Sequence, residues 1–583
     1  MGSQANGTII LLTCLIACGC RTNQPVDQPD PGHGHVTQQV HDNGAVAADH
    51  PIASQVGVSV LRQGGNAVDS AVATSFCLAV VRPFSCGLGG GGFMVVWDPS
   101  TQEAHALNYR ETSPAVVGYD YYTDDALDSI KHPVARYGVH ATGTPGTVAG
   151  LLAAHERLGS LPLDDLLAPA VELAMNGFVV DASYVAAAAH VGEIRRRYPS
   201  LESASQWVWE NLCDSGLIKV GDTVRQPALG ETLRTIARGG LGAWQAGPCM
   251  EIADYMKVNE GPLAAADMLS YSPRWLEPII VEDILDGYTL LAMPPPSSGG
   301  IAMAQVLQIF DSLIEEYELD DHESDAYIHL LAESMKHAFA DRAEHLADDA
   351  FEPVPRDRLL SVEYIDSLRS SIDPSLTKDP MQYGSIMPPP DDEGTSHLSV
   401  IDRNGMAVAC TETINSAFGS LVAVPSCGII LNNQMDDFTT VPGTANMYGL
   451  RQSDRNLPAA GKRPLSSMSP TILLHDGRVA MIAGASGGPR IITGTTQVIL
   501  NILKGRMEPV EAVARPRFHH QWMPERLYLE ADLESTELIR LLRERGHEVT
   551  RRDSVGTVQV IAIDDDGIKP ASDPRKGGQP AGY

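Results

Sequence analysis

One Gly-Thr junction in the sequence has the chemistry for self-cleavage. Gly394 and Thr395 follow a Pro- and Asp-rich stretch, 388–393, and precede apolar residues at 398–401, so a loop runs directly into a strand. The hydroxyl of Thr395 could attack the carbonyl of Gly394 and move the acyl group from nitrogen to oxygen before water releases a new N-terminus. The freed α-amine, with an unperturbed pKa near about 8, could then serve as general base for that hydroxyl. The same junction is also an ordinary step from loop to strand, and local composition alone favours this structural interpretation over a catalytic one.

A second set of side chains has the spacing of metal ligands. His337, Asp341 and His345 fall at i, i+4 and i+8 and would share one face of a helix. Such a face is solvated in most helices, and no other ligands accompany it, so we predict no metal site. His519 and His520 are adjacent and would point apart on a helix or a strand.

The cysteines do not indicate a zinc site, because no C-x-x-C pair occurs among those beyond residue 20. Buried free thiols and disulfides both remain open for an exported protein, and we predict no pairing. These six residues are Cys77, Cys86, Cys213, Cys249, Cys410 and Cys427.

The elements around these residues alternate between helix and strand, which indicates mixed α and β layers. Residues 51–82 predict two helices with a break at 64–66, and 301–317 predict a helix that the serines of the preceding turn, 294–300, could cap. The glycines of 87–92 precede an apolar strand. A phosphate-binding loop needs the opposite order, glycines after a strand and before a helix, so we exclude nucleotide binding.

The composition describes a globular protein: 583 residues, 43% hydrophobic and 20% charged. Acidic residues outnumber basic ones by 73 to 42, a formal charge of −31. Such a charge repels nucleic acid and anionic membrane surfaces, and we exclude polyanion binding.

The N-terminus reads as a targeting segment. The apolar run 8–17 is too short to span a membrane and ends at Cys18, in a Leu-Ile-Ala-Cys sequence that resembles a bacterial lipoprotein box. We therefore expect a signal peptide over 1–20 and a flexible polar spacer over 21–43. A cleaved soluble signal is one alternative, because residues 1–7 contain no Lys or Arg, and Cys20 is a second candidate lipid site.

Motifs of one known family run through nearly the whole chain, from about Gly44 to Tyr583. In the first part they are Gly64-Gly-Asn-Ala-Val-Asp69, Gly89-Gly-Gly-Gly-Phe93, Tyr109-Arg-Glu-Thr-Ser-Pro114, Gly143-Thr-Pro-Gly-Thr147 and Pro294 to Gly300. In the second part they are Thr395-Ser-His-Leu-Ser-Val400, Leu431-Asn-Asn-Gln-Met-Asp-Asp-Phe438, Lys462-Arg-Pro-Leu-Ser-Ser-Met-Ser-Pro470 and Pro516-Arg-Phe-His-His-Gln-Trp522. Together they resemble the γ-glutamyltranspeptidase family.

The resemblance implies the α/β fold of the N-terminal-nucleophile hydrolases, a four-layer αββα sandwich. It also implies cleavage into a large subunit, 44–394, and a small catalytic subunit, 395–583, which form a heterodimer. Thr395 would be the nucleophile and Thr413 the threonine that orients it, while Gly487 and Gly488 would supply the backbone N–H groups that stabilise the oxyanion.

Substrate residues follow from the same resemblance. A γ-glutamyl donor carries a free α-carboxylate and a free α-ammonium, so its pocket needs opposite charges at fixed places. Arg110, Ser466 and Ser467 match the residues that hold the carboxylate, and Asp437 matches the acid that holds the ammonium. The remaining pocket residues would be Asn415, Gln434 and a lid tyrosine, Tyr448.

The sequence therefore predicts a zymogen of an exported, periplasmic or cell-surface γ-glutamyltransferase and glutathione hydrolase. Its substrates would be glutathione or related amides, its acceptors water, amino acids or peptides, and it would need no metal or other cofactor. It would touch the membrane only through a lipid anchor and would bind no nucleic acid. A related acylase of β-lactam side chains or poly-γ-glutamate, and a non-catalytic surface lipoprotein, are the alternatives.

Overall fold

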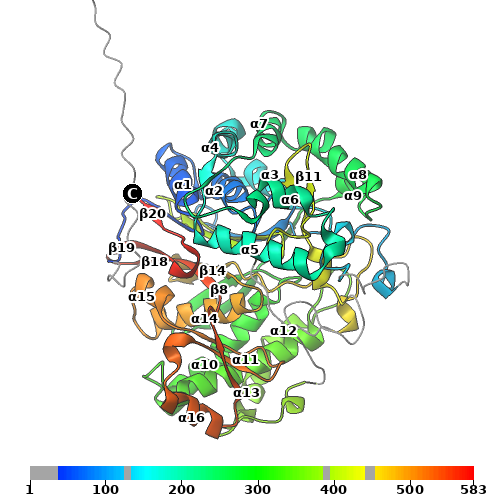
Figure 1. Ribbon diagram of the computed structural model, residues 1–583. Coiled ribbons are helices and arrows are strands. Elements are labelled where there is room, and N and C mark those ends of the chain that lie inside the picture. The colour runs from blue at the N-terminus through cyan, green and yellow to red at the C-terminus, as the bar shows by residue number, and fades with distance from the viewer. Residues whose placement is uncertain (1–36, 124–132, 385–393, 440–452) are drawn as a thin grey trace, which may run out of the picture. The chain divides into compact units, whose positions relative to one another are not determined.

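Two β-sheets are packed face to face, and each carries helices on its outer side (Figure 1). The structure is a computed structural model that describes residues 37–123, 133–384, 394–439 and 453–583. The layers run helix, sheet, sheet, helix, and the predicted αββα sandwich is confirmed.

The first sheet places the predicted nucleophile at the end of a central strand. Its order is β20-β1-β9-β10-β2-β3-β6, and the neighbours pair antiparallel. On β9 and β10, Ser396 pairs with Glu412, which leaves Thr395 and Thr413 side by side at one edge of the sheet. The strands are Ala581–Gly582, Ala45–Ala48, Ser396–Ile401, Ala407–Thr413, Gly91–Asp98, Glu103–Asn108 and Arg274–Leu276.

The second sheet positions the predicted oxyanion glycines and the predicted serine pair. β14 ends at Ser486, directly before Gly487 and Gly488, and β13 begins at Thr471 shortly after the Ser466-Ser467 pair. Its order is β19-β18-β14-β13-β8-β7, with bounds Gly567–Ser572, Thr557–Asp564, Arg478–Ser486, Thr471–His475, Tyr288–Ala292 and Ile279–Ile284.

Central strands are buried on both faces, which explains their continuous apolar runs. On β2, Phe93 and Val95 face the core shared with the second sheet, whereas Met94 and Val96 face the helices outside the first sheet. Of the glycines at 87–92, Gly91 and Gly92 belong to β2 itself and are buried in the sandwich.

The first sheet is covered by helices from the N-terminal half of the chain. α1 and α2 are the two helices predicted over 51–82, and Asn66 closes a capping box at the start of α2. The helices of this layer are α1 Pro51–Arg62, α2 Ala67–Val81, α3 Thr147–Leu158, α4 Leu163–Asn176, α5 Ala182–Arg197, α6 Gln206–Asn211, α7 Pro227–Ala246, α8 Pro248–Val258 and α9 Ala265–Ser270.

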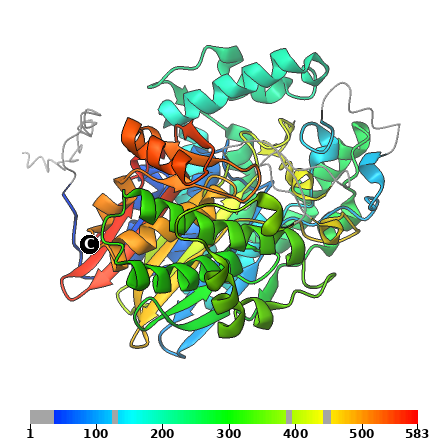
Figure 2. The same cartoon turned by 90° about the horizontal axis from the view of Figure 1, so that it is seen from below.

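The second sheet is covered by α10, α11 and α14 with shorter helices around them (Figure 2). α10 forms where a helix was predicted. Of the serines in the preceding turn, Ser297 accepts the backbone N–H of Gly299 (3.1 Å), whereas the hydroxyl of Ser298 donates to the carbonyl of Ser466 (2.7 Å) and makes no cap bond. The bounds are α10 Gly299–Tyr317, α11 Asp325–His345, α12 Arg356–Leu359, α13 Val362–Ser371, α14 Arg490–Leu503, α15 Pro509–Ala514 and α16 Thr536–Glu544.

Short strands complete the described part of the chain. They are β4 Phe178–Val179, β5 Thr223–Val224, β11 Ala423–Val424, β12 Ile429–Ile430, β15 Phe518–His519, β16 Leu527–Glu530 and β17 Val549–Arg552. At the end of the predicted spacer, His41 already exchanges backbone hydrogen bonds with Ile568 (2.9 Å each). Among the described helices none has the length and apolarity needed to cross a membrane. The six cysteines beyond residue 20 are buried free thiols.

Candidate active site

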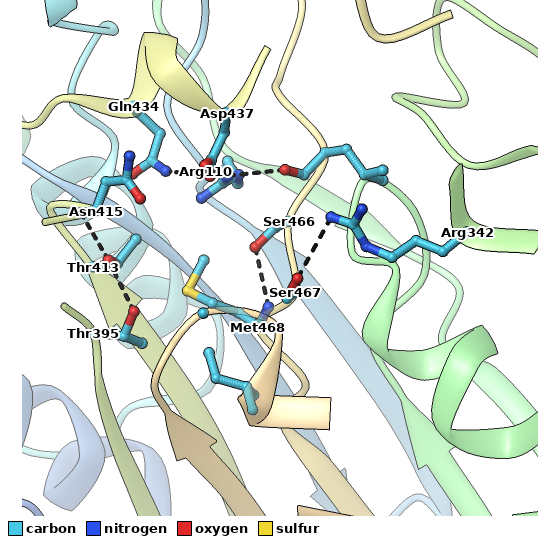
Figure 3. Close-up of a pocket in the computed structure, with 13 residues that line it drawn as sticks. Arg110, Arg342, Thr395, Thr413, Asn415, Gln434, Asp437, Ser466, Ser467 and Met468 are labelled. Atoms are coloured by element: carbon cyan, nitrogen blue, oxygen red, sulfur yellow. Dashed lines mark hydrogen bonds and ion pairs between the residues drawn. The ribbon is translucent and has the colours of Figure 1, made fainter. Parts of the chain in front are cut away.

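Residues predicted for catalysis and for substrate binding line one small pocket (Figure 3). The first sheet contributes Thr395 and Thr413, and the second contributes Gly488 and the two serines before β13. The lining residues are Arg110, Arg342, Thr395, Thr413, Asn415, Gln434, Asp437, Leu465, Ser466, Ser467, Met468, Gly488 and Ile491.

The hydroxyl of Thr395 is held by its neighbour on β10. It donates to Oγ1 of Thr413 (3.1 Å), which also accepts the backbone N–H of Asn415 (2.8 Å). All three residues are buried. Because Thr413 is itself fixed by the Asn415 amide, it restricts the rotamer of the Thr395 side chain.

The Gly394-Thr395 junction is tight and strained. A Cβ at position 394 would lie 2.0 Å from the carbonyl oxygen of Asn415, so the backbone there admits only glycine. Thr395 has φ +111°, which is an outlier for a β-branched residue. Its amide donates to the carbonyl of Ser85 (3.1 Å). Cleavage before Thr395 would abolish this torsion and release its strain.

Lys576 is a site residue that the sequence did not reveal. Its ammonium donates to the carbonyl oxygen of Thr395 (2.5 Å), to Asp49 (2.6 Å) and to Ser486 (3.3 Å). One cation thereby connects the end of β14 and the residue that follows β1 to the nucleophile. It stands in the C-terminal Arg575-Lys576 pair, which by local sequence resembles a solvated basic turn.

Gly487 and Gly488 join β14 to α14 with φ values of +123° and +59°. Two successive positive φ angles are accessible to glycine without steric cost. The pair stands just before the N-terminus of α14, where backbone N–H groups and the helix dipole favour negative charge.

The charged end of the pocket is closed by an internal ion pair. Nη2 of Arg110 lies 2.5 Å from Oδ2 of Asp437, and Gln434 donates to the same oxygen (2.7 Å). Arg110 also donates to the carbonyls of Pro464 (3.0 Å) and Leu465 (3.2 Å). The free volume is about 20 Å³, room for a water molecule. A zwitterionic ligand must therefore separate Arg110 from Asp437 to enter.

Arg342 is the second residue that sequence reasoning missed. From α11 it donates to the hydroxyls of Ser298 (2.9 Å) and Ser467 (3.5 Å). Burial lowers the pKa of its guanidinium to about 10, with Arg110 acting in the same direction and Asp437 opposing. Arg342 thus adds a second buried cation beside the predicted carboxylate clamp, and it also orients one of the clamp's serines.

Glu111 lies directly behind the clamp and is fully buried. Its carboxyl oxygens lack a hydrogen-bond partner within the described residues, and the nearest guanidinium nitrogen, on Arg110, is 3.9 Å away. Burial raises the pKa of Glu111 to about 8. At neutral pH this acid is largely protonated and does not compete with Asp437 for Arg110.

Two predicted residues, Cys18 and Tyr448, lie outside the described residues. For His337 and Asp341, on the face of α11 that also carries His345, the expectation of a solvated face was wrong, since both side chains are buried. Asp341 is buried and accepts bonds from Tyr364 and Gln305 (2.7 Å each) because α10 and α13 pack on that face.

A cluster of buried histidines and glutamates has the geometry of metal ligands, but it already holds a cation. The ammonium of Lys336 lies 3.0 Å from a carboxylate oxygen of Glu333 and 2.8 Å from one of Glu525. Nδ1 of His329 is 2.8 Å from Nε2 of His547. We assign no metal there; the ligand-spaced groups are His329, Glu333 and His547, and His520, Glu525 and His547.

Comparison with models of protein families matches residues 53–583 to gamma-glutamyltranspeptidase. The chain belongs to the γ-glutamyltranspeptidase family. Among curated proteins it is 38% identical to the glutathione hydrolase proenzyme of Escherichia coli strain K12, over 91% of this chain and 90% of that protein. It is also 38% identical to glutathione hydrolase 2 of Arabidopsis thaliana, over 93% and 94%.

Solved structures agree with this membership. Cephalosporin acylase from Bacillus halodurans superposes with a TM-score of 0.82 at 25% identity, over 96% of this chain and 99% of the other. A chain of gamma-glutamyltranspeptidase from Pseudomonas nitroreducens, complexed with L-DON, matches with a TM-score of 0.53 at 33% identity, over 59% of this chain and 98% of the other. The family match thus covers most of the chain, residues 53–583.

Proposed function

We propose that this γ-glutamyltranspeptidase cleaves itself between Gly394 and Thr395 and then uses Thr395 to transfer γ-glutamyl groups. The donors are glutathione and related amides, and the acceptors are water, amino acids or peptides. The hydroxyl of Thr395 attacks the γ-amide carbonyl and forms a γ-glutamyl ester, which the acceptor resolves.

One observation carries this proposal: the hydroxyl of Thr395 and the side chains of Arg110 and Asp437 border the same pocket. A cation and an anion at its far end match the α-carboxylate and α-ammonium of a glutamyl group. The hydroxyl of Thr395 at the other end matches the position of the scissile amide. On this proposal the N–H groups of Gly487 and Gly488 stabilise the oxyanion, and Ser466, Ser467, Asn415 and Gln434 line the bound glutamyl group.

The full chain of 583 residues would be the precursor. Cleavage would produce subunits 44–394 and 395–583. The strained φ of Thr395 and the tight packing of Gly394 support cleavage at this bond. The proenzyme names of bacterial relatives support it as well.

The proposal is tested by intact mass spectrometry together with release of chromophore from a γ-glutamyl anilide. Wild type should split before Thr395 and turn over, whereas Thr395→Ala should stay whole and inactive. Ser396→Ala is the matched control, since it removes the neighbouring buried hydroxyl and should still be cleaved. A single, folded but inactive wild-type chain would refute the proposal in favour of a non-catalytic scaffold.

A glutaryl anilide separates this function from that of a related acylase. It carries the carboxylate of the glutamyl group but lacks the α-ammonium that Asp437 would bind. We expect turnover of the γ-glutamyl anilide to exceed that of the glutaryl anilide by about tenfold or more, the value of one charge-assisted hydrogen bond. Equal turnover of both would favour the acylase alternative.

We further propose export through the signal at residues 1–20 and lipid attachment at Cys18. The apolar run before Cys18 supports this. Cys18→Ala should release the enzyme from the membrane fraction while its activity is retained.

A further inference from the structure

Arg342 is a buried cation without an anionic partner. It stands on α11 and is 1% exposed. Within the part of the chain that the structure describes, no carboxylate oxygen lies within 4 Å of its guanidinium, which contacts the neutral hydroxyls of Ser298 and Ser467 instead. Buried charges in proteins are normally paired, because an unpaired ion loses its hydration without compensation. The surroundings of Arg342 therefore leave room for an anion that the protein itself does not supply.

One nitrogen of this guanidinium also lacks a hydrogen-bond acceptor. Nη1 is buried and makes no hydrogen bond with the described residues, whereas Nε donates to Ser298 (2.9 Å) and Nη2 to Ser467 (3.5 Å). Arg342 lines the small pocket, and Figure 3 shows its side chain reaching from α11 toward the serine pair. Leaving a buried donor unpaired costs about 1–3 kcal/mol. An acceptor that enters the pocket would remove this cost.

The other cation of the pocket is already engaged. Nη2 of Arg110 lies 2.5 Å from Asp437, and the same guanidinium donates to two backbone carbonyls. The charged side chains that line the pocket are Arg110, Arg342 and Asp437, two cations and one anion. The α-ammonium of a glutamyl donor thus meets one acid, while its α-carboxylate meets two guanidinium groups.

We propose that Arg342 binds the α-carboxylate of the donor directly, as a second guanidinium beside Arg110. The inference rests on the proposed γ-glutamyl transfer and adds a residue that determines specificity for a free carboxylate. Because Arg342 already donates to Ser467, a carboxylate held by that serine lies within reach of the same guanidinium. The planar guanidinium, whose Nε is fixed by Ser298, is preorganised for such a contact.

The test compares kcat/KM for the γ-glutamyl anilide and for its α-carboxamide, which keeps the ammonium and the scissile anilide but has no carboxylate. Their ratio measures the preference for the carboxylate. Arg342→Gln should lower this ratio by about tenfold, the value of one charge-assisted hydrogen bond. Part of the preference should persist, because Arg110 remains.

Arg358→Gln is the matched control. This arginine also contacts α11, donating to Nε2 of His345 (3.1 Å), but it is exposed and does not line the pocket. Its replacement should leave the ratio unchanged.

A second comparison separates direct binding from a role in orienting Ser467. Ser467→Ala removes the hydroxyl through which an orienting role would act. In this background Arg342→Gln should still lower the ratio by about tenfold, because a direct contact does not depend on the serine. If it causes no further change there, Arg342 acts only through Ser467 and the inference is wrong.

Intact mass shows whether each variant is cleaved, and ratios are compared between cleaved proteins. Arg342→Met is the second variant, because an apolar side chain of similar volume often replaces a buried charge without loss of stability. It should lower the ratio by the same factor as Arg342→Gln, and an unchanged ratio in either variant overturns the inference.

Failure of this inference differs from failure of the proposed function. If wild type turns over the γ-glutamyl anilide but accepts the α-carboxamide equally well, the pocket does not select a carboxylate and Arg342 has no such role. If wild type turns over neither compound, γ-glutamyl transfer itself is refuted.

Discussion

At the scale of single residues, Thr413 decides where the hydroxyl of Thr395 points. Thr413→Val keeps the shape of the side chain but removes the oxygen that Thr395 and the Asn415 amide both contact. We expect both the rate of self-cleavage and kcat to fall by about 10²-fold, because a misplaced nucleophile loses its attack geometry. Time-resolved mass spectrometry measures the first, and anilide hydrolysis by the cleaved fraction measures the second.

Thr413→Ser is the matched control, since it restores the hydroxyl and should recover most of both rates. KM should change little in Thr413→Val, because the ionic contacts to the substrate come from Arg110 and Asp437. A large rise in KM with unchanged kcat would contradict the positioning role.

The residues that sequence reasoning missed have no local signal. Arg342 lies within α11, among residues whose spacing drew attention to the face of His337 and Asp341. It reaches the pocket only because α11 packs beside the turn that holds Ser298 and the serines before β13. Lys576 likewise meets Thr395 through the pairing of distant strands. Long-range contacts of this kind are not encoded in a local pattern.

At the scale of elements, the spacing between the two sheets sets the distance between the nucleophile and the Gly487-Gly488 pair. Gly484 on β14 faces the ring of His397 on β9, and a Cβ there would lie 2.3 Å from Cε1 of the imidazole. Gly484→Ala should therefore push β9 and β14 apart. We expect a stability loss of about 1–3 kcal/mol, typical of overpacking, and slower self-cleavage.

Urea unfolding of the uncleaved Thr395→Ala chain, with and without Gly484→Ala, measures the stability change as a single-chain process. Gly242→Ala is the control, because nothing lies within 4 Å of a Cβ added at that position of α7. It should be neutral or slightly stabilising, since alanine favours a helix over glycine. If Gly484→Ala also leaves the free energy of unfolding unchanged, the two sheets can accommodate a methyl group at this position and the prediction is wrong.

Elements with a strong periodic pattern could be predicted, and those defined by pairing could not. α1, α2 and α10 form where their apolar spacing and breaks indicated helices. β1, Ala-Val-Ala-Ala, carries no distinctive pattern, yet it pairs with both β9 and the C-terminal β20. The strand order, and with it the placing of Thr395 beside Thr413, depends on such pairings.

At the scale of the whole molecule, the layers were predicted only through the resemblance of the motifs to a known family. Alternation of helix and strand indicated mixed layers but not two stacked sheets, because strands such as β2 are buried on both faces and lose the alternation that marks an exposed face. The charge of −31 argued against binding to nucleic acid or to anionic membrane surfaces, and it carried no information about the fold.

Response to acid is a property of the whole molecule, because buried groups in several layers have shifted pKa values. Burial lowers the pKa of several histidines. For His50 and His397 the pKa falls to about 3. Such groups stay neutral in the folded state and take up protons on unfolding, so they destabilise the fold as pH falls below about 6.5. Burial raises the pKa of Glu111 to about 8 and that of Glu412 to about 7. These two acids bind protons more readily in the folded state, so they stabilise the fold as pH falls toward about 4.5.

His397 allows one of these contributions to be isolated. It is enclosed between the sheets, with Nδ1 2.7 Å from the hydroxyl of Thr411 and Nε2 3.2 Å from that of Ser399. Its folded pKa lies far below the unfolded value, so between pH 7.5 and 5.5 it should remove about 1.4 kcal/mol of stability. The measurement compares the Thr395→Ala protein with and without His397→Gln. The difference between their unfolding free energies should change by that amount between the two pH values. The absolute cost of losing the imidazole cancels in this comparison, and equal slopes would mean that the pKa of His397 is the same in the folded and unfolded chain.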